Sequence, residues 1–172
     1  MKYFNGFSLK GEEVFFESML LESELTVAGF SYGSQKAFDY VYDSKERVDR
    51  LILLSPAFFQ NEKKSFIKTQ LRYYKADKEG YIEQFLKNVT YPSSLELKDY
   101  VVAGRLEELE DLLTYTWDKE KFTELLDRGV VIEVFIGGRD KIVNSKESFA
   151  FFSELTHTYF LKYEGHILQV IN

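Results

Sequence analysis

The chain has 172 residues and a formal net charge of −6, with no cysteine and only two histidines. This length suits one ordinary domain. The missing cysteines exclude disulfide scaffolds, thiolate metal sites and cysteine nucleophiles. A negative chain is a poor general binder of nucleic acid, which needs cations against phosphates. No apolar run has the length of a membrane span or of a signal-peptide core, so we expect a cytoplasmic protein.

Short apolar runs alternate with helical patterns at both ends of the chain. In chain order, the pattern predicts a strand at 1–4, a helix at 11–21, a strand at 24–30, a helix at 32–42, a strand at 48–54, a strand at 130–136, a helix at 144–155 and a strand at 159–163. Strands of the buried type that alternate with helices predict an α/β fold, with a parallel sheet and helices on both faces.

The middle of the chain has a different pattern. Residues 58–128 contain no convincing strand, and helices are predicted at 59–75, 78–87, 94–113 with a break near Gly104, and 118–127. We therefore predict a core formed by residues 1–57 and 129–172, with residues 58–128 inserted as a helical lid.

A candidate nucleophile lies between the second predicted strand and the helix that follows it. Gly29-Phe30-Ser31-Tyr32-Gly33 is a G-x-S-x-G sequence in the strand–turn–helix context of a nucleophile elbow. Small residues on both sides of the serine permit a sharp turn. The helix N-terminus directs N–H groups at the site, where they favour developing negative charge.

Candidate partners for Ser31 follow two later strands. Asp140 comes directly after Gly137-Gly138-Arg139, and His166 follows the last predicted strand. Sites in open parallel sheets form outside the carboxyl ends of the strands, whereas His157 precedes its strand and is assigned no role. The order serine–acid–histidine, each after a different strand, predicts a catalytic triad of Ser31, Asp140 and His166.

An oxyanion hole requires two backbone N–H donors that face the developing negative charge. The residue after the nucleophile, Tyr32, would supply the first donor. The loop after the first strand would supply the second, and we assign it to Phe7, although the Ser8 hydroxyl is an alternative donor that the sequence does not exclude.

These motifs resemble those of the α/β-hydrolase superfamily. Asn5-Gly6-Phe7 is similar to the His-Gly-aromatic turn of many members, and the segment 137–143 is similar to their acid turn. The resemblance implies a truncated α/β-hydrolase with about five mainly parallel strands, lacking strands at one edge of the family sheet. It also implies a serine esterase that needs no metal and no cofactor.

A narrower resemblance comes from the small size, from the segments 29–37 and 54–59, and from Gly165-His166 near the end of the chain. Together they resemble the compact pimelyl-acyl-carrier-protein methyl ester esterases of biotin synthesis, the BioV type. This resemblance implies that the chain removes a methyl ester from pimelyl-acyl carrier protein, with the carrier protein as partner.

The charge pattern agrees with an acidic partner. The stretch 59–78 carries six basic and two acidic residues on an otherwise acidic chain. Helical spacing places Lys64, Lys68, Arg72 and Lys75 on one face. We predict that this face binds the acidic carrier protein, and a simple solvated helix face is the alternative.

Two other functions fit the same motifs. A thioesterase or a small-ester carboxylesterase would use the same triad. A hydrolase fold that only binds a partner would keep the architecture without the chemistry.

Overall fold

Five parallel strands form one sheet in the computed structural model of the protein, which describes residues 1–169. The strands are β1 (Lys2–Phe4), β2 (Thr26–Phe30), β3 (Arg50–Leu54), β4 (Val131–Gly137) and β5 (His157–Leu161), and they lie in this order across the sheet. Phe30 pairs in register with Leu54, and Leu54 with Phe135, so the strands end level with one another. The residues that follow these strands are therefore brought to one edge of the sheet.

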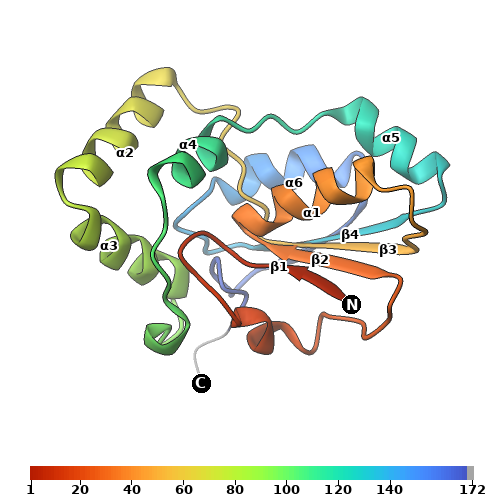
Figure 1. Ribbon diagram of the computed structural model, residues 1–172, viewed down its shortest axis with the longest axis horizontal. Helices are drawn as coiled ribbons and strands as arrows, with labels where there is room; N and C mark the ends of the chain where they lie inside the picture. The colour runs from red at the N-terminus through yellow and green to blue at the C-terminus, as the bar shows by residue number, and fades with distance from the viewer. Residues whose placement is uncertain (170–172) are drawn as a thin grey trace.

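Three α-helices cover one face of the sheet (Figure 1). They are α1 (Tyr32–Asp43), α5 (Lys119–Asp127) and α6 (Ser145–Ser153). Phe38, Phe122 and Phe152 from these helices are fully buried against apolar residues of β2, β3 and β4. This cluster is the larger part of the hydrophobic core.

The opposite face has a thinner cover than the sequence predicts. The segment expected to form a helix at 11–21 contains only the 3-10 helix η1 (Glu12–Phe16), which buries Phe16 against Phe30. The amides of Met19 and Leu20 both donate to the Phe16 carbonyl, in the turn that follows the helix. Val89 and Ile167 complete the cover of this face.

Three further helices lie beyond the carboxyl ends of the strands (Figure 1). They are α2 (Lys64–Ala76), α3 (Lys78–Thr90) and α4 (Leu106–Thr114), and a short 3-10 helix, η2 (Lys98–Tyr100), joins α3 to α4. Phe59, Tyr74 and Leu109 from this region are buried together with Phe7 and Tyr32 of the sheet core. We call α2, α3 and α4 the insertion helices.

The helix α5 packs differently from the insertion helices, although it lies within the stretch 58–128. Phe122 and Leu125 are fully buried against the sheet, and Phe122 lies 4.3 Å from the ring of Phe38. The expected helix 94–113 is also shorter, because only Leu106–Thr114 is α-helical after the break at Gly104.

Residues 1–169 include no helix that is both long and apolar enough to cross a bilayer.

Candidate active site

Ser31 occupies a sharp turn between β2 and α1. Its backbone has a φ of 54° and a ψ of −113°, a combination that residues other than glycine rarely adopt. A Cβ on Gly29 would lie 2.2 Å from the Gly33 carbonyl oxygen, and one on Gly33 would lie 2.0 Å from the Phe4 carbonyl oxygen. The two glycines of the motif are therefore required by close backbone contacts on either side of the serine.

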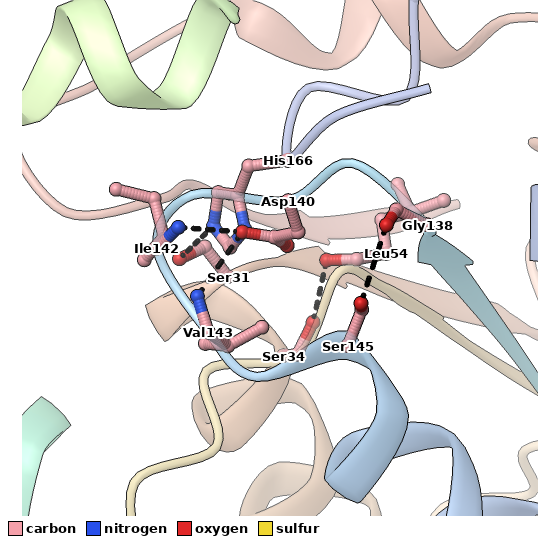
Figure 2. A network of polar contacts seen from close by, with 9 residues as sticks. All are labelled: Ser31, Ser34, Leu54, Gly138, Asp140, Ile142, Val143, Ser145 and His166. Carbon is pink, nitrogen blue, oxygen red and sulfur yellow. Dashed lines mark hydrogen bonds and ion pairs between the residues drawn. The ribbon is translucent and has the colours of Figure 1, made fainter. Parts of the chain in front are cut away.

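His166 lies between Ser31 and Asp140 (Figure 2). Its Nε2 is 2.8 Å from the Ser31 Oγ, and its Nδ1 is 2.6 Å from an Asp140 carboxylate oxygen. Three residues that are far apart in the sequence, each after a different strand, thus form one chain of hydrogen bonds. This arrangement can move a proton from the serine hydroxyl to the imidazole while the carboxylate holds the ring and offsets its charge.

The loop after β4 orients the carboxylate of Asp140. The amides of Ile142 and Val143 donate to one carboxylate oxygen at 2.7 Å and 3.1 Å, which leaves the other oxygen for His166 (Figure 2). The side chains of Asp140 and His166 are fully buried, and Ser31 is only 1% exposed. Because water competes poorly in such a site, these hydrogen bonds are stronger than they would be at the surface.

His157 lies at the other end of the sheet. It is the first residue of β5, which begins two residues earlier than the sequence predicts, and its side chain is exposed. It therefore lies at the amino end of a parallel strand, away from Ser31 and Asp140.

The two expected oxyanion donors both lie next to the serine turn. Phe7 is on the loop after β1, and Tyr32 is the first residue of α1. Within the described residues, no acceptor is recorded for either amide. Both residues line a hollow of about 240 Å³, which also contains Ser8, Lys36 and Glu108. Burial, together with the nearby Asp111 and Glu108, raises the pKa of the Tyr32 phenol to about 12, so the phenol stays neutral.

A second hollow, of about 330 Å³, lies among the insertion helices. Its apolar lining includes Phe66, Phe85 and Leu109, and it reaches Ile142 beside Asp140. Polar side chains of Gln70, Gln84 and Asn88 line it as well. This hollow has room for an extended, mainly apolar chain close to the loop that carries Asp140.

The predicted basic face is exposed on α2. Lys64, Lys68, Arg72 and Lys75 are all exposed, and none of them forms an ion pair with a carboxylate of residues 1–169. The four charges are therefore available to a partner.

Two buried polar side chains near the site were not predicted from the sequence. Glu12 accepts a hydrogen bond of 2.7 Å from the Gly6 amide, and so anchors the loop that carries Phe7. Gln35, on the helix that follows the serine, donates to the carbonyls of Ala57 and Leu112. No local sequence pattern marks these contacts, because their partners are set by the tertiary fold.

The comparisons with known proteins identify the fold. No protein-family model and no curated protein matches the chain. Among solved structures it is similar to an esterase from Exiguobacterium antarcticum, with a TM-score of 0.64 and 15% identity over 82% of this chain and 59% of the esterase. It is also similar to BioG from Haemophilus influenzae, with a TM-score of 0.61 and 13% identity over 96% of this chain and 87% of BioG.

A third similar structure is Est816, described as an N-acyl homoserine lactone degrading enzyme. The TM-score is 0.67, with 13% identity over 98% of this chain and 86% of Est816. These likenesses show that the chain has the α/β-hydrolase fold, reduced to five strands. The chain spans less than two thirds of the length of the Exiguobacterium esterase.

Proposed function

We propose that the protein is a serine carboxylic ester hydrolase with Ser31, His166 and Asp140 as its catalytic triad. The observation that carries the proposal is the continuous hydrogen-bond chain from Ser31 Oγ through His166 to Asp140, at 2.8 Å and 2.6 Å. The strained backbone of Ser31 at the carboxyl end of β2 adds support, because strain of this kind concentrates at functional sites.

The chemistry follows from this geometry. His166 takes the proton of Ser31 as the serine oxygen attacks the ester carbonyl carbon, and the Phe7 and Tyr32 amides hold the oxyanion. His166 returns the proton to the departing alkoxide, which leaves as an alcohol. Water, deprotonated by His166, then hydrolyses the acyl-enzyme to a carboxylic acid and restores Ser31.

The first test is covalent labelling combined with mutation. A fluorophosphonate should label the wild type, and Ser31→Ala should abolish both labelling and ester turnover. We expect Ser31→Ala and His166→Ala each to lower kcat by about 10³-fold or more, and the double variant to be little worse, since the residues act as a unit.

The histidine that lies at the far end of the sheet supplies the control. His157→Ala should keep labelling and turnover unchanged. A wild type that neither labels nor turns over any ester would contradict the proposal and favour a binding module. A higher kcat/KM for the thioester than for the oxygen ester of the same acyl group would instead assign a thioesterase.

We further propose that the substrate is the methyl ester of a pimelyl group carried by an acyl carrier protein. The support is the resemblance to the compact esterases of biotin synthesis, together with the exposed basic face on α2, whose cations form no ion pair in the described part of the chain. The hollow among the insertion helices has an apolar lining that suits the acyl chain. Turnover of a carrier-bound dicarboxylic acid monomethyl ester, compared with the same ester free of the carrier, tests this substrate.

A further inference from the structure

The carboxyl end of α3 contacts the loop that carries His166. The Val89 carbonyl accepts a hydrogen bond of 3.1 Å from the Ile167 amide. A Cβ on Gly165 would lie 1.6 Å from the Tyr91 carbonyl oxygen, so only glycine fits at this contact. The residues on both sides of His166 are therefore packed directly against the end of an insertion helix.

The same end of α3 also contacts the loop that carries Asp140. The Tyr91 ring lies close to both of the cationic residues that flank the acid. The Lys141 Nζ is 3.4 Å from the ring centroid, and the Arg139 guanidinium carbon is 5.5 Å from it. Arg139 also donates a hydrogen bond of 3.2 Å to the Tyr91 hydroxyl. A cation over an aromatic face is attracted to the ring, so Tyr91 binds both neighbours of Asp140.

Backbone contacts also join the two loops directly, because a Cβ on Gly137 would lie 2.0 Å from the Gly165 carbonyl oxygen. The Arg139 amide donates to the Glu164 carbonyl at 2.8 Å, and Asp140 is otherwise held by amides of its own loop. Arg139 and Lys141 carry like charges on either side of Asp140 in the sequence, and the electron-rich ring of Tyr91 attracts both. Loss of the ring would remove the side-chain contacts that hold both neighbours of Asp140 against the end of α3, which leaves the backbone contacts to position this segment.

We propose that Tyr91 is a positioning residue for the His166–Asp140 pair. Through Tyr91, the insertion helices would influence the alignment of the triad. The inference rests on the proposed function, because it assumes that the His166–Asp140 pair serves ester hydrolysis. A small displacement of a catalytic group is enough to lower kcat substantially, since reactivity depends steeply on geometry.

The kinetic test compares two variants of Tyr91. Tyr91→Leu removes the ring and the hydroxyl, and should lower kcat for a small soluble ester by about tenfold or more with KM changed by less than about twofold. Tyr91→Phe keeps the ring and loses only the hydrogen bond to Arg139, so it should stay within about threefold of the wild type. A kcat effect with constant KM separates positioning from substrate binding.

A matched control comes from α1. Tyr42 has a similar environment, because Lys121 lies 4.7 Å from its ring and its hydroxyl donates to Glu124. Tyr42 is remote from the triad, so Tyr42→Leu should leave kcat unchanged. If Tyr91→Leu does not fold, the double variant Arg139→Gln with Lys141→Gln is used instead. It removes the same contacts by changing the two exposed cations rather than the ring, and it should reproduce the loss of kcat.

A second readout does not depend on activity. The short His166–Asp140 hydrogen bond should give a low-field proton resonance in NMR spectra, which His166→Ala removes and His157→Ala retains. Tyr91→Leu should broaden or shift this resonance, and Tyr42→Leu should not. A wild type without esterase activity would overturn the proposed function, while the resonance would still test the role of Tyr91. Unchanged kcat and an unchanged resonance in Tyr91→Leu would overturn the inference.

Discussion

At the scale of single residues, Glu12 is a carboxyl group in an unusual place. It is fully buried, one oxygen accepts from the Gly6 amide, and the other has no partner among the described residues. Burial raises the pKa of Glu12 above its ordinary value of 4.5, and it outweighs the hydrogen bond from Gly6, which lowers it. The charged form is therefore the unfavourable one in the folded protein.

The raised pKa predicts how stability depends on pH. A group whose pKa is higher in the folded state contributes stability below its unfolded pKa and loses it as the pH rises through the folded value. We expect Glu12→Gln, which stays neutral and can still accept from Gly6, to match the wild type near about pH 4, below the unfolded pKa, and to be more stable near about pH 8. Thermal unfolding at the two pH values measures this difference.

Glu17 supplies the control, because it is an exposed carboxyl just beyond the same 3-10 helix. Glu17→Gln should show no comparable gain at the higher pH. Equal stabilities of Glu12→Gln and wild type at both pH values would mean that folding does not raise the pKa of the buried carboxyl.

At the scale of elements, α5 shows that position in the sequence does not decide where a helix packs. Phe122→Ala should lower the free energy of unfolding by about 3–5 kcal/mol, because it leaves a cavity among Phe38, Trp117 and Phe152. Chemical denaturation measures the loss. The same helix offers the control, since Leu126 is 40% exposed and Leu126→Ala should change stability by about 0.5 kcal/mol or less.

Much of the fold was predictable at this scale because its signals are local. Buried strand runs, the glycines around Ser31 and the polar residues at strand ends indicated the sheet and the meeting of Ser31, Asp140 and His166. The packing of α5, the short η1 and the contacts of Tyr91 were not predictable, since each depends on residues distant in the sequence. The helical pattern at 11–21 indicates which face is apolar, but it does not predict how many helical turns form in the folded protein.

At the scale of the whole molecule, the charge is distributed unevenly. The chain carries −6 overall, while α2 presents four cations that form no ion pair within residues 1–169. If the basic face binds a carrier protein as proposed, Lys68→Glu with Arg72→Glu should raise KM for a carrier-linked ester about tenfold and leave a small soluble ester unchanged, because a small ester does not contact this face. Added salt should lower the wild-type kcat/KM for the carrier-linked ester, since exposed charges are screened over about 10 Å at 0.1 M.

A double variant with the same change in net charge separates docking from overall charge. Lys45→Glu with Lys98→Glu alters two exposed residues outside α2 that form no ion pair within residues 1–169, and should leave both substrates unaffected. Equal losses on both substrates in the α2 variant would indicate damage to the insertion helices. No loss on either would mean that the basic face is merely solvated.

The left-handed backbone of Ser31 has a consequence for how this protein can evolve. The fold holds the serine in a conformation that costs on the order of 1–3 kcal/mol, a cost that glycine would largely avoid. A selection for heat resistance alone would therefore tend to replace the serine with glycine, and a selection for ester turnover would restore it.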